Sequence, residues 1–453
     1  MKILVVGQGK VGQSIAEALN KEHHEIVVID HNPRVLSKKR DQLDVICVEG
    51  NGANAEILQE AKVSECDLCI AVTSSDEINL LSCLMAKKLG AKNTIARVRN
   101  PHYSRDIYLF MDELGLSMHI NPEFESAREI ARLLRFPTAN KMESFCGGKV
   151  DIIEGTIEEN SPLNGLALKD LFHKFKVKII ICAVVRDNEI IIPDGNFVLR
   201  FKDKVNIVGA LSDVEQFVRT IKKEKPAVQN VMIVGGGIIS YYLARSLAKL
   251  RINTKIIEID ELKCNDLALR LPETTIIQGD GTDIDLLQEE GYEDMDAFVA
   301  LTGIDEENMI LALNALNVNV NKVIAKVDHL QNNGIVSNLG IDSIICPKDI
   351  TANHIVSYVR SMQNTVGSNI AAMSKITGGK AEALEFVVKD SMKFIGIPLA
   401  QLKFKSNLLV ATIVREGRLI YPNGNDAILA NDHIVVVTTQ NGLKDVHDIF
   451  VRG

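Results

Sequence analysis

Three glycines near the start of the chain have the spacing of a phosphate-binding loop. Gly7, Gly9 and Gly12 form "GQGKVG", directly after the apolar run "KILVV" and at the start of a helical pattern. In such a loop the first glycine permits a tight turn, the second lets a pyrophosphate approach the backbone, and the third allows close helix packing. The phosphates would lie at the helix N-terminus, where free N–H groups and the helix dipole favour negative charge.

An acidic residue further along the chain extends this pattern. Asp30 ends the strand-like run "IVVID". A carboxylate there can accept hydrogen bonds from both ribose hydroxyls and would repel a 2′-phosphate. The pattern therefore favours NAD or an adenine nucleotide over NADP, although Arg34 is close enough to leave NADP open. The alternative is that Asp30 only begins the turn "DHNP".

Three further candidates stand at the ends of later expected strands. Thr73 and Ser74 follow the fourth strand at its carboxyl end, where open α/β sheets bind ligands. Alternatively they cap a helix, with Ser74 as the N-cap and Glu77 completing a capping box. Arg97 ends the fifth strand in "TIAR" and is either a phosphate clamp or part of a surface salt bridge.

The chain repeats itself at an offset of about 229 residues, so it carries these candidates twice. "VEGNGANAEILQEA" (48–61) matches "IQGDGTDIDLLQEE" (277–290), and "VVRDNEIIIPDGN" (184–196) matches "IVREGRLIYPNGN" (413–425). The register persists from the first part of the repeat into the second. The repeat unit is therefore a duplicated pair of domains rather than a short solenoid repeat.

The second glycine loop departs from the first. "GGGIIS" keeps Gly235 and Gly237 but has Ser240 at the third glycine position, and Glu258 replaces Asp30. Lys326 stands where Arg97 stands. Ser240 adds a side chain where the helix and strand approach closely, so the second copy is expected to bind nucleotide more weakly or to prefer a different one.

The first part of each unit alternates apolar β-branched runs with amphipathic helical patterns. This rhythm predicts an α/β fold with a Rossmann-like doubly wound parallel sheet. In the first copy the expected strands are 2–6, 26–30, 45–48, 68–72, 94–98 and 117–120. The expected helices are 11–20, 33–42, 54–62, 77–89 and 103–113.

The second part of each unit has a different pattern. Residues 188–209 alternate apolar and polar side chains around Asp-Asn and Asp-Gly turns, which predicts a hairpin in a small α+β domain. The charged stretch 220–230 is the expected linker between units. We therefore expect nucleotide-binding domains at 1–137 and 229–363, and small α+β domains at 140–225 and 370–453.

Composition limits the function classes. The 453 residues have a net charge of −8, so no basic excess is available for binding nucleic acid. No apolar run approaches the ~20 residues of a membrane helix, and no secretion signal is evident, so we expect a cytosolic protein unless a partner recruits it. Cys66 and Cys69 have metal-ligand spacing but no companion cysteine pair or histidine nearby, so a buried strand is expected there and no metal site.

The sequence offers no recognisable catalytic group. None of the ten histidines recurs at corresponding positions of the two copies, and no nucleophile elbow, H-E-x-x-H helix or Walker A loop is present. The simplest interpretation is that the protein binds nucleotides and does not catalyse a reaction of them. The alternative is an NAD-dependent oxidoreductase whose catalytic site is not recognisable.

Taken together, the motifs resemble a known family. "MKILVVGQGKVG", "GNGAN", "AVTSSDEIN", "IARVRNP" and the trailing hairpin, all duplicated, are similar to the TrkA family, the peripheral subunits of bacterial Trk potassium-uptake systems. Each half then resembles a regulator-of-potassium-conductance (RCK) unit, a nucleotide-binding domain followed by a C-terminal domain. The resemblance covers essentially the whole chain.

The resemblance implies a ligand set and a partner. NAD(H), or alternatively ATP/ADP, would contact the first copy and, with less support at Ser240, the second. The implied residues are Gly7, Gln8, Gly9, Lys10, Val11, Gly12, Asp30, Thr73, Ser74 and Arg97 in the first copy, and Gly235, Gly236, Gly237, Ile238, Ile239 and Glu258 in the second.

It also implies an assembly. Such proteins bind the cytoplasmic face of a membrane potassium transporter of Trk/Ktr type and gate it, without entering the membrane themselves. Gating rings of eight units would need four chains of two units each. The helical stretches 121–136 and 349–362 carry apolar faces expected to contact another domain or subunit; the alternative is packing within their own domain.

Overall fold

The chain folds into two compact units, each built from both halves of the sequence. The computed structural model describes residues 1–40, 44–135, 141–187, 189–221, 228–328, 341, 343–364, 370–389, 392, 394–440, 442–443 and 445–451. The first unit joins Met1–Ala131 to Val228–Val356, and the second joins Arg132–Ala227 to Ser357–Gly453. Among the described residues, no helix is both long enough and apolar enough to cross a bilayer.

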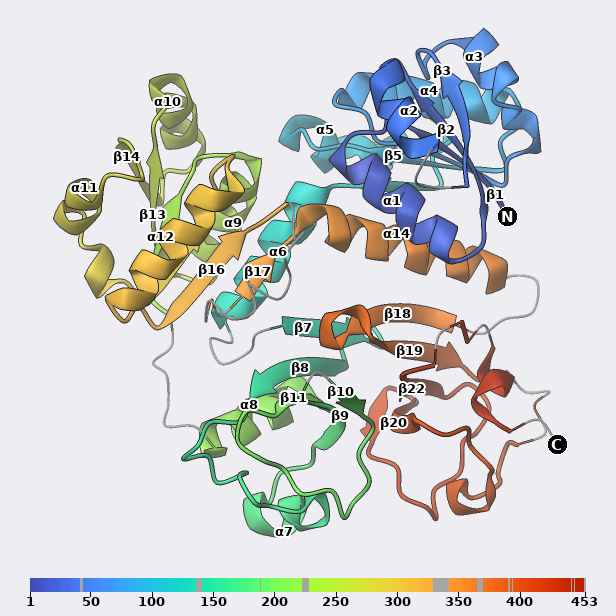
Figure 1. The fold of residues 1–453 in the computed structure, drawn as a ribbon, viewed down its shortest axis with the longest axis vertical. Helices are drawn as coiled ribbons and strands as arrows, with labels where there is room; N and C mark the ends of the chain where they lie inside the picture. The colour runs from blue at the N-terminus through green and yellow to red at the C-terminus, as the bar shows by residue number, and fades with distance from the viewer. Residues whose placement is uncertain are drawn as a thin grey trace. The chain divides into compact units, whose positions relative to one another are not determined.

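The first domain of the first unit contains a six-stranded parallel sheet in the order β3-β2-β1-β4-β5-β6 (Figure 1). The strands are β1 (Lys2–Val6), β2 (Glu25–Asp30), β3 (Ile46–Glu49), β4 (Leu68–Ala71), β5 (Asn93–Arg97) and β6 (Met118–Ile120). Helices cover the sheet, so the central strands β1 and β4 are almost wholly buried. The predicted fold class and all six predicted strands are confirmed.

The helices of this domain follow the predicted rhythm with two corrections. They are α1 (Lys10–Lys21), α2 (Pro33–Arg40), α3 (Ala55–Glu60), α4 (Asp76–Lys88), α5 (Pro101–Asp106) and α6 (Pro122–Arg135). The helix predicted over 103–113 is wrong in extent, because α5 ends at Asp106 and only the short 3-10 turn Ile107–Leu109 follows. The N-cap of α4 is Ser75 instead of Ser74, since the Ser75 hydroxyl accepts the backbone N–H of Ile78 at 3.2 Å.

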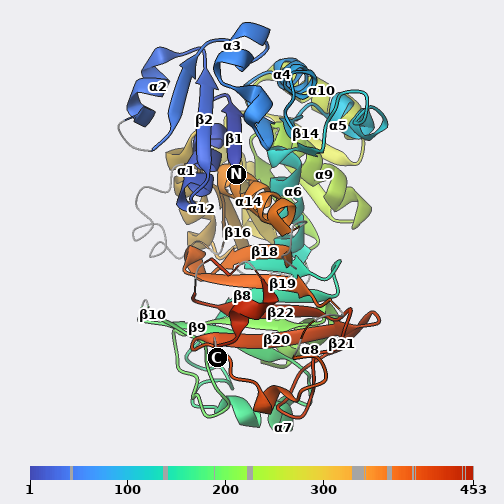
Figure 2. The same ribbon diagram turned by 90° about the vertical axis from the view of Figure 1, so that its right-hand side faces the viewer.

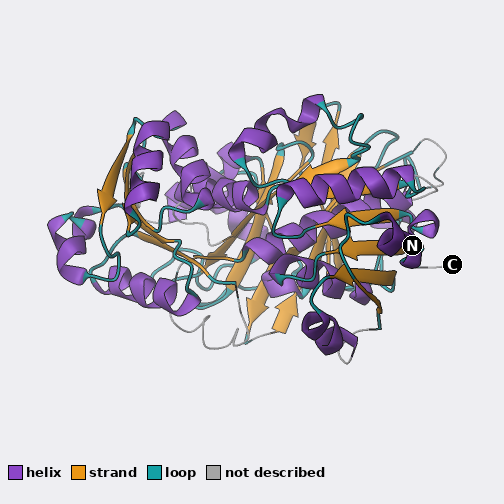
Figure 3. Cartoon of the chain, turned by 90° about the horizontal axis from the view of Figure 1, so that it is seen from above, coloured by secondary structure: helices purple, strands orange, loops and turns teal. Residues whose placement is uncertain are grey.

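The second copy repeats this architecture in the same unit. Its parallel sheet has the order β14-β13-β12-β15-β16-β17. The strands are β12 (Asn230–Val234), β13 (Asn253–Glu258), β14 (Thr274–Gln278), β15 (Ala297–Ala300), β16 (Lys322–Lys326) and β17 (Ser343–Ile345). The helices are α9 (Ile238–Lys249), α10 (Glu261–Arg270), α11 (Ile284–Glu289), α12 (Asp305–Asn317) and α14 (Pro347–Asn364), coloured purple with the others in Figure 3.

The two parallel-sheet domains contact each other through equivalent helices. The hydroxyl of Ser14 in α1 donates to Asp349 in α14 at 3.3 Å. At the corresponding place in the other copy, the ring of Tyr242 in α9 packs edge-on against Phe124 in α6 with centroids 5.3 Å apart. The first turns of both predicted apolar helices, near 121–136 and 349–362, thus make inter-domain contacts.

The second unit contains two five-stranded antiparallel sheets, ordered β10-β9-β11-β8-β7 and β18-β19-β22-β20-β21. The first has β7 (Lys141–Phe145), β8 (Val150–Thr156), β9 (Ile180–Arg186), β10 (Glu189–Ile191) and β11 (Lys204–Gly209), with helices α7 (Leu171–Phe175) and α8 (Leu211–Ile221). The second has β18 (Ile370–Ile376), β19 (Ala381–Val387), β20 (Leu408–Arg415), β21 (Arg418–Ile420) and β22 (His433–Thr438).

The strand pairing corrects the hairpin predicted over 188–209. β10 pairs with the preceding β9, whereas β11 lies between β9 and β8. The ends of 188–209 therefore do not pair with each other, and the Asp-Gly turn at Gly195 belongs to the loop between β10 and β11. The predicted Asp-Asn turn includes Asn188, which lies outside the described residues, as does most of the predicted linker 220–230.

One apolar core serves both small domains. It combines residues of the first sheet such as Phe145 and Val208 with residues of the second such as Ala383 and Val437, all nearly inaccessible to solvent. Figure 2 shows β8, β9, β20 and β22 of the two sheets close together. Because the core is shared, the two small domains are expected to fold as one body.

Candidate nucleotide-binding site

The first glycine loop excludes side chains at two of its three glycines. Gly7 has a φ of +93°, and a Cβ there would lie 2.8 Å from the backbone nitrogen of Thr73. A Cβ at Gly12 would lie 1.9 Å from the carbonyl oxygen of Gly7. At Gly9 a Cβ would meet nothing within 4 Å, and the φ of −69° suits any residue. The loop is therefore open at the glycine that the sequence predicts to face the pyrophosphate.

Helix α1 begins without a side-chain cap. Its N-cap is Gly9, and its first turn contains no acidic residue. By contrast, α4, α10 and α11 are capped by Ser75, Asp260 and Asp283, whose side chains accept backbone N–H groups. An uncapped N-terminus presents free N–H donors and the positive end of the helix dipole. The first turn of α1 thus fits a phosphate anion.

Asp30 fixes the shape of this loop. Its two carboxylate oxygens accept the backbone N–H of Gln8 at 2.6 Å and that of Asn32 at 2.8 Å. The Gln8 side chain is buried; its amide donates to the Gly7 carbonyl at 3.3 Å, and its Oε1 has no partner among the described residues. Asp30 therefore has a structural role whether or not it also holds a ribose, and Gln8 Oε1 is a buried acceptor beside the loop.

Thr73 and Ser74 lie next to the glycine loop, and the polar groups of Thr73 and the carbonyl of Ser74 already have partners. The N–H and hydroxyl of Thr73 both donate to Asn79 Oδ1, at 2.7 and 2.8 Å. The Ser74 carbonyl accepts a hydrogen bond from the guanidinium of Arg99. Thr73 thus forms the wall against which Gly7 turns, and contact of either residue with a ligand stays a prediction.

Arg97 points to a different partner. Its guanidinium lies 2.7 Å from the Glu123 carboxylate in α6, and the two side chains are only 13% and 16% exposed. The sequence allows Arg97 two roles, a phosphate clamp or a salt bridge, and in the structure Arg97 forms a salt bridge. A phosphate clamp by Arg97 stays a prediction that would require exchange of this partner.

In the second glycine loop, the acidic residue makes the same two backbone hydrogen bonds as in the first. The Glu258 carboxylate accepts the backbone N–H of Gly236 at 2.6 Å and that of Asp260 at 2.9 Å, as Asp30 does with Gln8 and Asn32. Gly235 has a φ of +100°, and a Cβ at Gly237 would meet nothing within 4 Å. Helix α9 also begins at a glycine N-cap with no acidic residue in its first turn.

Ser240 is accommodated at the third position of the second loop. Its side chain is fully buried, and its hydroxyl donates to the Gly235 carbonyl. The two loop residues before Ser240 differ in exposure, since Ile238 is 38% exposed and Ile239 is buried. The added side chain therefore closes the turn with a hydrogen bond instead of opening it, and a difference in affinity between the copies stays a prediction.

A contact that the sequence did not reveal joins the first loop to the second domain. The ammonium of Lys10, in the first turn of α1, lies 3.0 Å from the carboxylate of Asp328, just after β16. Asp328 is anchored by its backbone N–H to Asp305 at 3.0 Å, as Arg99 is anchored to Asp76 in the first copy. The loop motif contained Lys10, but nothing in the local pattern pointed to Asp328, 318 residues away.

A separate cavity of about 330 Å³ lies in the same unit, beside α5, β6 and the start of α6. Its lining includes Arg105, His119, Tyr242, Arg245 and His354, and none of the glycine-loop residues. Burial lowers the pKa of His119. The cavity is therefore distinct from the predicted nucleotide site.

Comparisons with known proteins agree with this architecture. The family model of the TrkA-N domain matches residues 3–122 and 231–347, and that of the TrkA-C domain matches residues 152–222 and 383–451. Among solved structures, the crystal structure of the GsuK RCK domain superposes with a TM-score of 0.63 at 16% identity, over 96% of this chain and 92% of that chain. The GsuK channel bound to NAD superposes with a TM-score of 0.63 at 17% identity, over 96% and 76%.

Relatives match over their full length, among them the following two. The Trk system potassium uptake protein TrkA homolog 2 of Methanosarcina mazei is 34% identical over 99% of this chain and 100% of that protein. The Trk system potassium uptake protein TrkA of Halomonas elongata is 30% identical over 100% of this chain and 99% of that protein. Fold and site thus define a tandem of Rossmann-like domains with glycine loops, each followed by a small RCK-type domain. The chain belongs to the TrkA family.

Proposed function

We propose that this chain is a nucleotide-binding regulatory subunit that gates a membrane potassium-uptake transporter of Trk/Ktr type in response to NAD(H) or ATP/ADP. The observation that carries the proposal is the pair of open glycine loops at uncapped helix N-termini, in a chain of the TrkA family. Full-length relatives named as potassium uptake proteins support the process, and the likeness to RCK domains supports the regulatory role. The subunit would bind the transporter from the cytoplasmic side of the membrane.

The residues of the first loop fit a dinucleotide or an adenine nucleotide. The free N–H groups after Gly9 would hold the phosphates, and the open space at Gly9 admits them. Asp30 would accept ribose hydroxyls with the lone pairs that Gln8 and Asn32 leave unused. The bound nucleotide would add negative charge at the loop and fill the space beside it. This role requires no reaction of the nucleotide.

The Lys10–Asp328 ion pair offers a route from nucleotide occupancy to domain arrangement. Phosphates bound at the first turn of α1 would compete with Asp328 for the Lys10 ammonium. A ligand that weakens a contact between two domains shifts the population of arrangements in which that contact is intact. The corresponding residues in the second copy are Ile238 and Arg99, so within the described residues this ion pair has no counterpart at the second loop.

This route predicts opposite effects of two substitutions on nucleotide affinity. Lys10→Ala should weaken binding about two- to fivefold, and Asp328→Asn should strengthen it by a similar factor, the scale of an ion pair whose lysine is exposed to solvent. Isothermal titration of NADH and ATP into the full chain measures both. Asp349→Asn, which removes the neighbouring contact to Ser14, is the matched control and should leave affinity unchanged. Unchanged affinity in Asp328→Asn would remove the proposed coupling.

The assembly implied by the family is a tetramer on the transporter. Each chain contributes its two sequence repeats, which gives eight repeats in all. The proposal is tested with the cognate membrane subunit in sealed vesicles, by following rubidium or potassium flux with the full chain added. We expect flux to depend on which nucleotide is present, and NADH absorbance to stay constant with a panel of carbonyl substrates. Flux that is the same with every nucleotide would contradict gating, and consumption of NADH would favour the oxidoreductase.

A further inference from the structure

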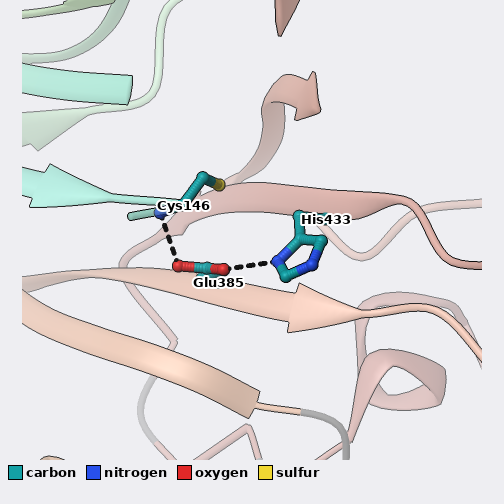
Figure 4. A group of neighbouring side chains, drawn as sticks. All are labelled: Cys146, Glu385 and His433. Carbon is teal, nitrogen blue, oxygen red and sulfur yellow. Dashed lines mark hydrogen bonds and ion pairs between the residues drawn. The ribbon is translucent and has the colours of Figure 1, made fainter. Parts of the chain in front are cut away.

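The shared core of the small domains contains a cluster of three potential metal ligands from two different repeats. Cys146 follows β7 of the first small domain, whereas Glu385 and His433 lie on β19 and β22 of the second (Figure 4). The ligand atoms of the three side chains all lie within 4.8 Å of one another. Cys146 and Glu385 are buried, and the His433 side chain is 41% exposed.

Hydrogen bonds already converge on the carboxylate of this cluster. Glu385 accepts the backbone N–H of Cys146 at 2.7 Å on one oxygen and lies 2.6 Å from His433 Nδ1 through the other. The backbone bond fixes the β7–β8 turn against β19 independently of the thiol. The Cys146 thiol is hydrogen-bonded to the same carboxylate, so thiol, carboxylate and imidazole form one connected group.

We propose that Cys146, Glu385 and His433 bind a divalent cation of borderline softness, Zn²⁺ in particular, and so connect the two small domains. Thiolate, imidazole and carboxylate are the three side-chain ligand types of Zn²⁺, and three protein ligands with an open position are a known zinc arrangement. The exposed edge of His433 leaves a path for the ion and for a water as fourth ligand.

Small side-chain movements suffice to complete the site. Ligand atoms around a tetrahedral Zn²⁺ lie roughly 3.3 to 3.7 Å apart, given metal–ligand distances of about 2.0 to 2.3 Å. The separation of 2.6 Å between Nδ1 and the Glu385 oxygen is that of a hydrogen bond. The ion would replace the shared proton, and the ring or carboxylate would shift by roughly 0.7 Å to make room.

The equivalent positions of the other repeat argue that the fold does not require this combination. Cys146 and Thr377 both follow the first strand of their sheets with positive φ, 53° and 52°. His433 is the first residue of β22, which pairs with β19, the strand of Glu385. In the other sheet, Lys204 is the first residue of β11, which pairs with the equivalent strand β8. The mirrored set would thus contain a hydroxyl and an ammonium, which is not a zinc site. The thiol of Cys146 and the imidazole of His433 therefore occur together at only one of these two equivalent places in the fold.

The Cys146 thiol lies in a buried place beside the Glu385 carboxylate, and this determines its protonation. Burial, followed by the neighbouring Glu385 carboxylate, raises the pKa of the Cys146 thiol to about 12, and Lys149 acts weakly in the opposite direction. Below that pKa the thiol is protonated, so Zn²⁺ must displace its proton. Affinity should therefore rise about tenfold per pH unit for each proton released.

The test uses the full chain, stripped of metal and titrated with Co²⁺ and then Zn²⁺. We expect one equivalent of Co²⁺ per chain with a thiolate-to-cobalt absorption band, displacement of that ion by Zn²⁺, and a higher midpoint of thermal unfolding with Zn²⁺. Cys146→Ser should abolish the band and weaken affinity at least tenfold, while its backbone N–H still bonds Glu385. His433→Gln should weaken affinity at least tenfold and keep the band.

Cys47→Ser is the matched control, because Cys47 is the only cysteine of the eight that is not buried. It should leave the band, the affinity and the thermal shift unchanged. Circular dichroism and nucleotide binding check that each variant is folded. A wild-type chain without the band, or a folded Cys146→Ser chain with unchanged Zn²⁺ affinity, overturns the proposal.

Discussion

Replacing Gly9 by Asp is expected to abolish nucleotide binding at the first loop while the chain stays folded. The side chain fits, because a Cβ at Gly9 meets nothing within 4 Å and the backbone there has a φ of −69°. Its carboxylate would occupy the N-terminus of α1, where it caps the free N–H groups and repels the phosphates. At a few ångströms this repulsion amounts to several kcal/mol, so affinity should fall roughly a hundredfold or more.

Calorimetry on the full chain measures this loss, and growth at low potassium shows its consequence. A potassium-uptake-deficient bacterium that carries the cognate membrane subunit should grow with the wild-type chain and not with Gly9→Asp. Gly9→Ala is the charge-free control: its methyl group fills part of the space at the loop but brings no negative charge, so it should reduce affinity much less than Gly9→Asp. Gly237→Asp reports the same change in the second loop. If Gly9→Asp folds, loses nucleotide and still supports normal uptake, the gating proposal fails.

A second large effect is expected from Asp203→Ala in the first small domain. Arg186 binds both oxygens of Asp203, with Nε at 2.8 Å and Nη2 at 2.7 Å, and Asp203 is 1% exposed. Asp203 also accepts the backbone N–H of Arg200 at 2.8 Å. Removal of the carboxylate leaves a largely buried guanidinium without its counter-charge, and breaking a buried pair in this way costs about 3–5 kcal/mol.

The duplicated pair Arg415–Asp432 provides the matched comparison, with both bonds of the same form at 2.9 and 2.8 Å. Hydrogen exchange of the full chain is the suitable measurement, because the chain has no tryptophan for fluorescence. Asp203→Ala should reduce protection of β11 by at least a hundredfold, and Asp432→Ala should do the same for β22. Protection that stays at the wild-type level in both variants would contradict a stabilising role for these pairs.

The parts of the fold that depend on local pattern were predictable from the sequence. Each parallel strand is a short apolar run, and the loop at Gly7 and Gly12 allows only glycine because of contacts within a few elements of the same domain. Asp30 could be placed beside the loop from its position at the end of β2. Its second role, as acceptor for two backbone N–H groups, depends on how the chain turns after β1 and β2, which the local pattern does not specify.

Long-range arrangement was not predictable in the same way. The periodicity of β9, β10 and β11 does not specify which strands pair: β10 forms an antiparallel pair with the preceding β9, whereas the two ends of 188–209 do not pair with each other. Ser74 and Ser75 are equivalent as caps in sequence, and only the helix geometry decides between them. The contacts Lys10–Asp328 and Cys146–Glu385 join residues 318 and 239 positions apart, and nothing local indicates either partner.

The two inter-domain contacts of the first unit differ in kind although they occupy equivalent places. On one side Ser14 meets Asp349 and Lys10 meets Asp328; on the other Tyr242 meets Phe124. A dimer of identical units related by a two-fold axis must repeat every contact across the axis. In a tandem chain the two copies can differ in sequence, so equivalent contacts need not be the same. Covalent duplication has therefore broken a symmetry, which leaves an ion pair on one side of the interface and aromatic packing with hydrogen bonds of the Tyr242 hydroxyl on the other.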